Sequence, residues 1–181
     1  MITPRWLAVL VVSGATLVSG CFNVWTPPLD GTFENGRYPD AALAVITNEC
    51  LVINGIAQPL RELLAAANAE GVGLAPERSS FLPPGVTGPP KIESCYRSYD
   101  GQVWWHNYYC SIGKCQNAAV PGTSKHGFGR AVDFQDQNGE LTFESPGYLW
   151  LAAHAGEYGF FQPPNQQQGS AGEEAWHWEH E

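Results

Sequence analysis

Residues 124–133, which read SKHGFGRAVD, carry the densest structural information in the chain. Glycines on both sides of Phe128 let the backbone turn sharply between His126 and Asp133. The apolar residues that precede Asp133 predict a strand over 131–134, which is a rigid support for a carboxylate. We therefore expect His126 and Asp133 to face one point.

A second informative segment lies at residues 174–178, which read EAWHW. Its pattern predicts a last strand in which His177 points to one face and the flanking tryptophans point to the other, where they pack. Two imidazoles and one carboxylate, from His126, His177 and Asp133, suit Zn²⁺ and leave a fourth position open, as in catalytic zinc sites. We expect Glu174 on the loop before this strand, as the base that takes a proton from metal-activated water.

The composition describes one acidic globular domain. The chain has 181 residues, is 44% hydrophobic and 15% charged, and has a formal net charge of −9. This length is enough to bury a sizeable core. The negative charge argues against a nucleic-acid partner, because phosphates would be repelled.

The N-terminus has the layout of a secretory signal. A single basic residue, Arg5, precedes an apolar run and then small residues. Residues 17–21 (LVSGC) resemble the lipobox of bacterial lipoproteins, in which the cysteine, here Cys21, is lipidated. The alternative is an ordinary signal with an incidental cysteine.

The expected organisation follows from that signal. A signal peptide covers 1–20, a lipidated tether covers 21–40, and the folded domain covers 41–181. We expect an exported protein, anchored by lipid to the outer face of the bacterial cytoplasmic membrane or in the cell envelope.

Four cysteines remain after Cys21, and export makes disulfides the leading interpretation. Three pairings exist. The short spacing favours Cys110 with Cys115, which leaves Cys50 with Cys95. A cysteine zinc site is the competing interpretation, but the spacing does not resemble paired C-x-x-C knuckles.

Short strands and a few helices in mixed order predict an α+β fold. Helices are expected at 60–69, ending near Gly71, at 99–109, and from Ser145 as N-cap to Gly159. A short strand is expected at 92–97. Residues 75–90 and 162–173 are expected to be loops, the latter mobile.

Three segments resemble a known family. Residues 124–133 match the S-x-H-x-x-G-x-A-x-D signature of VanY-type D-alanyl-D-alanine carboxypeptidases and VanX-type dipeptidases, and residues 174–177 match their E-x-W-H ending. Residues 94–102 (SCYRSYDGQ) resemble their S-G-Y-R-S-Y-x-x-Q stretch, with Cys95 in place of glycine. The resemblance covers roughly residues 50–181 and implies a hedgehog-like zinc peptidase fold, a small antiparallel sheet with flanking helices around a single zinc site.

The resemblance also implies a role for each matching residue. One zinc ion per chain is bound by His126, Asp133 and His177, and Glu174 is the catalytic base. Arg97 binds or polarises a carbonyl or carboxylate of the substrate, and Ser124 and Gln102 are weaker candidates for substrate binding.

The implied activity is release of the terminal D-Ala from peptidoglycan stem peptides. One alternative is an endopeptidase that uses the same site on a cross-link or an L-Ala-D-Glu bond. Another is a non-catalytic zinc-containing binding module, but binding alone does not need the base Glu174 or the cation Arg97.

Overall fold

The computed structural model describes residues 33–47, 50–76, 87 and 93–181. The expected signal peptide, Cys21 and most of the expected 75–90 loop lie outside these residues. The described helices are α1 (Ala57–Ala69), α2 (Tyr99–Ser111) and α3 (Pro146–His154). The described strands are β1 (Leu43–Thr47), β2 (Cys50–Ile53), β3 (Ala75–Pro76), β4 (Ala131–Asp136), β5 (Gly139–Glu140), β6 (Phe160–Phe161) and β7 (His177–His180). The fold is α+β, as predicted.

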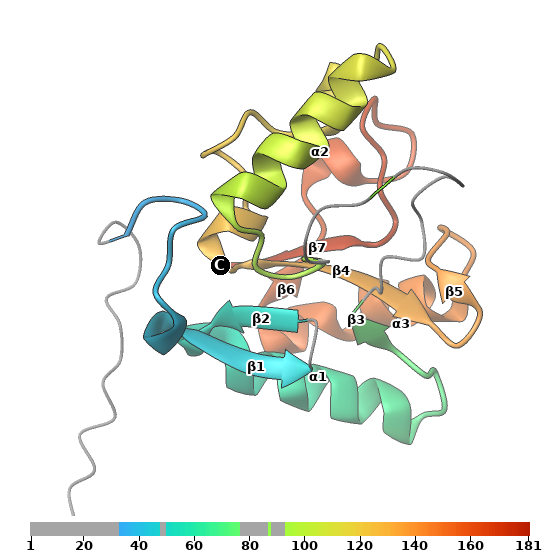
Figure 1. Ribbon diagram of the computed structural model, residues 1–181. Coiled ribbons are helices and arrows are strands. Elements are labelled where there is room, and N and C mark those ends of the chain that lie inside the picture. Colours follow the sequence, from blue (N-terminus) through green and yellow to red (C-terminus); the bar gives the residue numbers. More distant parts are fainter. Residues whose placement is uncertain (1–32, 48–49, 77–86, 88–92) are drawn as a thin grey trace, which may run out of the picture.

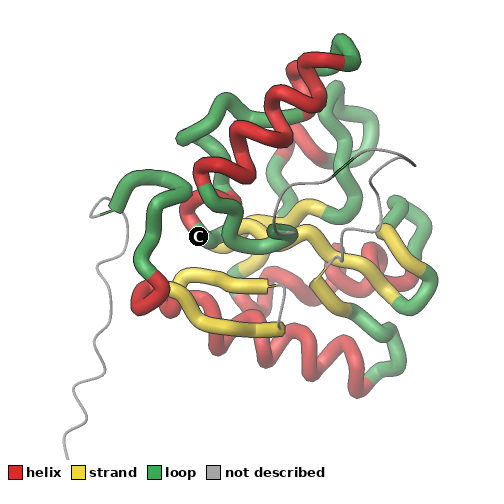
Figure 2. The backbone as a smooth tube through the Cα atoms, in the orientation of Figure 1, coloured by secondary structure: helices red, strands yellow, loops and turns green. Residues whose placement is uncertain are grey.

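The strands form two antiparallel sheets. β1 and β2 make a hairpin, and the larger sheet has the order β3-β4-β7-β6, with β5 also paired to β4. Figure 1 shows α2 on one side of the larger sheet and α1 and α3 on the other. Figure 2 shows that long loops join the elements on the α2 side. The larger sheet therefore separates an apolar core on one side from a loop-lined face on the other.

Alternation along β4 and β7 separates these two sides. Val132 and Phe134 are fully buried in the core, and Trp178 stands directly opposite Val132. The Trp178 ring lies 6.1 Å from that of Tyr148 in α3. Because successive side chains point to opposite faces, Asp133 projects away from this core.

Both glycines of the turn before β4 are required by close packing. Gly129 has a φ of 65°, and a Cβ there would lie 2.8 Å from the backbone nitrogen of Ile53. A Cβ on Gly127 would overlap the side chains of Asn35 and Gln102. Any larger residue at these positions must therefore displace the turn that carries His126.

The folded domain begins earlier than predicted, because residues 33–40 belong to it. Asn35 Nδ2 donates to the carbonyl oxygen of Ser124 at 2.7 Å, and the Gly36 amide donates to that of Gly127 at 2.8 Å. Tyr38 is buried in the core. The predicted tether therefore ends too late in the sequence. Residues 33–40 are polar and contain proline, and such a sequence gives no sign of hydrogen bonds to distant segments.

The expected helices are present, with different boundaries. α1 begins at Ala57 and buries Leu60, Leu63 and Ala67 at helical spacing. α3 begins at Pro146 with Ser145 as its N-cap residue, as predicted, but the Ser145 side chain makes no capping hydrogen bond. Instead, Asp136 at the end of β4 accepts a hydrogen bond from the Gly147 amide at 3.1 Å.

Two other local expectations are corrected. Residues 93–97 bend and form no strand. The loop expected to be mobile at 162–173 is held by hydrogen bonds from Gln162 and Gln167. Within the described residues, no helix is long and apolar enough to cross a membrane.

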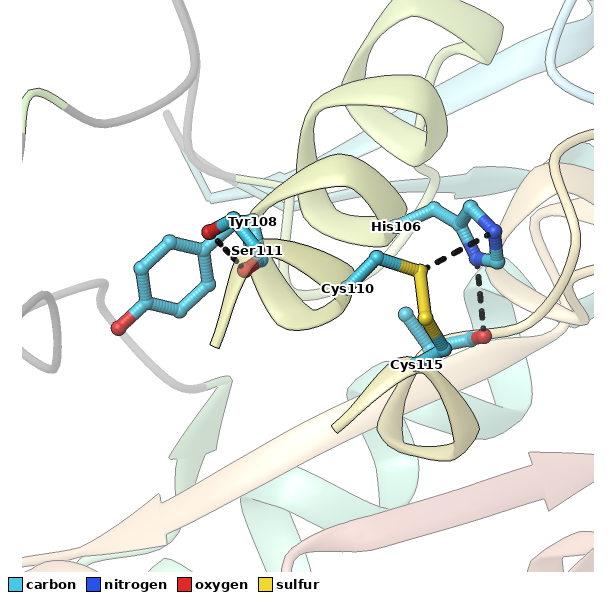
Figure 3. The surroundings of a disulfide bond; sticks show 6 residues. His106, Tyr108, Cys110, Ser111 and Cys115 are labelled. Carbon is cyan, nitrogen blue, oxygen red and sulfur yellow. Dashed lines mark hydrogen bonds between the residues drawn. A yellow bond between two sulfur atoms is a disulfide. The ribbon is translucent and has the colours of Figure 1, made fainter. Parts of the chain in front are cut away.

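The structure contains both expected disulfides. Cys50–Cys95 ties β2 to the segment before α2, and Cys110–Cys115 closes the turn after α2. Figure 3 shows His106 beside the second disulfide, and its Nε2 lies 3.6 Å from Cys110 Sγ.

We expect the two crosslinks to contribute unequally to stability. The Cys50–Cys95 disulfide joins residues 45 positions apart, so replacing both cysteines by Ala should lower the free energy of unfolding by roughly 4 kcal/mol. The Cys110–Cys115 disulfide joins residues 5 positions apart, so the same replacement there should lower it by roughly 2 kcal/mol. Urea unfolding of the two double variants measures this difference. Equal losses would contradict the loop-length argument.

Candidate active site

Three donor atoms from distant parts of the chain converge at the loop-lined face of the sheet. Asp133 Oδ1 lies 3.0 Å from His177 Nδ1 and 3.3 Å from His126 Nε2, and the two nitrogens are 3.2 Å apart. Donors of a tetrahedral zinc ion, each about 2.0–2.1 Å from the metal, are separated by about 3.3 Å. The geometry and chemistry of this buried set therefore fit zinc.

Strand pairing and a short turn produce this convergence. Asp133 of β4 pairs directly with His177 of β7, and directly opposed residues in an antiparallel pair project to the same face. His126 lies on the 3-10 turn His126–Phe128, and its Nδ1 donates to the carbonyl oxygen of Cys95 at 2.7 Å. That bond fixes the tautomer and leaves the Nε2 lone pair directed at the other two donors.

The pKa values of the three groups shift in different directions. Burial lowers the pKa of His126. Burial also disfavours the imidazolium of His177, but hydrogen bonds to the carboxylates of Asp133 and Glu179 raise its pKa to about 9. Burial would raise the pKa of Asp133, yet the two imidazoles hold it well below its usual range.

Glu174 lies on the loop before β7, as expected from its spacing to His177. Burial, reinforced by the negative charge of Asp133, raises the pKa of Glu174 to about 7. A carboxyl with such a pKa can both accept and release a proton near neutral pH. The structure thus brings the expected base to the donor cluster.

Arg97 also reaches the cluster. Its backbone amide donates to the carbonyl oxygen of His126 at 3.0 Å, and its Nη2 lies 3.5 Å from Asp133 Oδ2. The guanidinium lies over the Trp105 ring, 5.8 Å from its centroid. The Arg97 Nε is buried and has no hydrogen-bond partner in the described part of the chain.

Gln102 is buried behind the site, and its contact with substrate stays a prediction. Its side chain is 3% exposed. Nε2 donates to Asn35 Oδ1 at 2.9 Å and to the Arg97 carbonyl oxygen at 3.2 Å, while Oε1 accepts from the Gly122 amide at 2.9 Å. Gln102 therefore braces the Arg97 segment from behind.

Ser124 is buried beside the turn that carries His126. Its carbonyl oxygen accepts hydrogen bonds from Asn35 Nδ2 and from the Gly127 amide. These bonds give its backbone a structural role, and contact of its hydroxyl with substrate stays a prediction.

Sequence reasoning missed Tyr109 of α2. Burial raises the pKa of its hydroxyl, and the charge of Glu174 raises it further, which places the ring beside the candidate base. Tyr109 also stacks on Trp105, with ring centroids 5.9 Å apart. The spacing of four residues between these two aromatic rings was the available signal, because it places them on one face of a helix.

A three-donor metal site beside a carboxyl of raised pKa and a partly buried arginine is typical of metal-dependent hydrolases. Comparison with known proteins makes this more specific. Residues 87–181, just over half of the chain, match the family VanY, D-alanyl-D-alanine carboxypeptidase. The chain therefore belongs to this family, and the resemblance drawn from its three motifs is confirmed.

Solved structures share the fold. VanYB in complex with D-alanine-D-alanine superposes with a TM-score of 0.55 at 24% identity, over 76% of each chain. A D,D-pentapeptidase VanY variant in complex with Zn(II) gives 0.56 at 24% identity, over 76% of this chain and 77% of the other. The LdcB L,D-carboxypeptidase gives 0.58 at 25% identity, over 80% and 70%. Among curated proteins, none matches at a significant level.

We expect zinc binding to release a proton from His177. Because its pKa is raised to about 9, the proton competes with the metal below that pH, and the apparent zinc affinity should rise about 10-fold per pH unit up to pH 9. Calorimetric titration at pH 7.5 in buffers of different ionisation enthalpy measures the released proton. The variant His154→Gln, altered at the partly exposed last residue of α3, should behave like wild type. An affinity independent of pH between 7 and 9 would contradict the assignment.

Proposed function

We propose that this chain is a zinc-dependent carboxypeptidase that hydrolyses the terminal D-Ala from peptidoglycan stem peptides. Family membership supports the reaction, and the convergence of Glu174 and Arg97 on the three-donor cluster is the observation that carries it. Zinc bound by His126, Asp133 and His177 supplies a Lewis acid that lowers the pKa of water and polarises the scissile carbonyl.

In this proposal Glu174 transfers the proton. Its carboxylate accepts a proton from the attacking water and delivers it to the amine of the departing D-Ala. The pKa of about 7 that burial and Asp133 produce suits both halves of that transfer. A carboxylate with an ordinary, lower pKa would be a weaker base in the first half, because it would accept the proton from water less readily.

Arg97 is proposed to bind the C-terminal carboxylate or polarise the carbonyl of the substrate. A guanidinium stays charged and offers a planar fork of donors that matches a carboxylate. The backbone bond to His126 and the stacking on Trp105 hold this fork in place. The buried Nε without a partner is consistent with a donor reserved for a ligand.

The same residues can serve closely related reactions. One solved relative is an L,D-carboxypeptidase. An endopeptidase acting on a cross-link or an L-Ala-D-Glu bond would use the same ligands and base. The substrate assay below therefore includes each type of peptide.

Full-length protein in detergent should release D-Ala from a pentapeptide stem, as measured by mass spectrometry, and chelation should stop the release. Glu174→Gln should lower kcat by about 10²- to 10⁴-fold, because the base is lost, while zinc remains bound. The matched control is Glu173→Gln, which alters an exposed carboxylate on the same loop.

The outcomes separate the related activities. Turnover of only the tetrapeptide would indicate an L,D-carboxypeptidase, and turnover of only cross-linked dimers would indicate an endopeptidase. Absence of turnover on every peptide, with zinc bound, would favour the non-catalytic module.

We also propose that the protein is exported and held at the bacterial envelope by a lipid on Cys21. The LVSGC segment at 17–21 supports this, because two acyl chains anchor a protein stably. Cys21→Ser should move the protein from the membrane fraction to the soluble fraction after cell lysis. Retention of the variant in membranes would contradict lipid anchoring.

A further inference from the structure

The loop that carries Glu174 is held by a neighbouring turn. Gln166 ends the short 3-10 turn Pro164–Gln166. Its carbonyl oxygen accepts from the Glu174 amide at 2.9 Å, and its side-chain Nε2 donates to Glu174 Oε2 at 3.3 Å. One residue therefore contacts both the backbone and the carboxylate of Glu174.

Gln162 joins this turn to the core. It is buried, and its Nε2 donates both to the Gln166 carbonyl oxygen at 3.2 Å and to the Glu174 carbonyl oxygen at 3.0 Å. Its Oε1 accepts from the hydroxyl of Tyr148 at 3.2 Å. Because Tyr148 lies on α3 beside Trp178, the position of the Glu174 loop is set from the core.

The orientation of the Gln166 amide is fixed by charge. Rotating the amide by half a turn would bring its oxygen against the carboxylate of Glu174, where two acceptors repel. With Nε2 toward Glu174, the Gln166 Oε1 is buried and has no hydrogen-bond partner among the described residues. A buried acceptor without a donor costs stability, and such exceptions in folded proteins call for a functional explanation.

We propose that Gln166 is a positioning residue for proton transfer. By donating to Oε2, it holds the carboxylate of Glu174 in one rotamer and directs the other oxygen, Oε1, to the reacting water. Gln162 fixes the backbone beneath it. This inference rests on the proposed function, in which Glu174 is the base.

The test compares Gln166→Leu with Gln168→Leu in full-length protein. Gln168 is exposed on the same loop, so it is a matched control. Loss of the donor should let the Glu174 carboxylate move, and kcat should fall about 10- to 100-fold. KM for the pentapeptide stem and zinc affinity should match those of the control, because the substrate and metal contacts are untouched.

Gln166→Glu is the second variant, which keeps the shape of the side chain and replaces its donor with an acceptor. It should lower kcat at neutral pH at least as far as Gln166→Leu. If Gln166→Leu and Gln168→Leu have the same kcat, the inference is wrong. A fall in kcat accompanied by loss of zinc affinity in both Gln166 variants would also overturn it, because that result indicates a structural role.

Failure of the proposed function has a different signature. In that case wild type itself shows no turnover on any stem peptide, and the positioning role falls with it. If wild type is active, Glu174→Gln is inactive and Gln166→Leu is fully active, then the function stands and only the positioning role is wrong.

Discussion

The hydrogen bonds of residues 94–97 are the constraint on which the site depends. The carbonyl oxygen of Ser94 accepts from the Asp133 amide at 2.8 Å, and that of Cys95 accepts from His126 Nδ1 at 2.7 Å. The Arg97 amide returns a bond to the His126 carbonyl oxygen at 3.0 Å. The disulfide from Cys95 to Cys50 ties this segment to β2. Two donors of the metal site and the candidate substrate cation thus share one short support.

Charge compensation makes it tolerable to bury so many ionisable groups. Asp133 lies between two imidazoles and the guanidinium of Arg97, and the imidazoles keep its pKa well below the usual range. Glu174 is near the same negative charge and is mostly surrounded by protein, so its pKa rises to about 7. The pKa values of these two carboxyl groups therefore shift in opposite directions. The lowered pKa suits Asp133 to metal binding, and the raised pKa suits Glu174 to proton transfer.

The two sides of the larger sheet have different roles: one packs against the core, and the other carries the candidate active site. Phe134 and Trp178 pack into the core on one side, while Asp133 and His177 project from the same strands to the other. A shift of β7 relative to β4 by one residue would exchange these faces, turning His177 toward the core and Trp178 toward the metal site. The packing of the core thus fixes the alignment of the metal donors. Hydrogen bonds from Tyr148 of α3 through Gln162 and Gln166 also fix the position of Glu174.

The sequence by itself determined the kinds of donors, the family and most helices, because these depend on short motifs such as SKHGFGRAVD. It also indicated both disulfides. Only the tertiary structure decided which polar residues serve the site and which support it. Gln102 shares a motif with Arg97, yet it is buried against Asn35, a residue that was expected in a tether. Gln166 was expected in a mobile loop, yet it contacts Glu174. The physical reason is that a hydrogen bond between distant segments depends on how those segments pack, and that packing leaves no local pattern in the sequence.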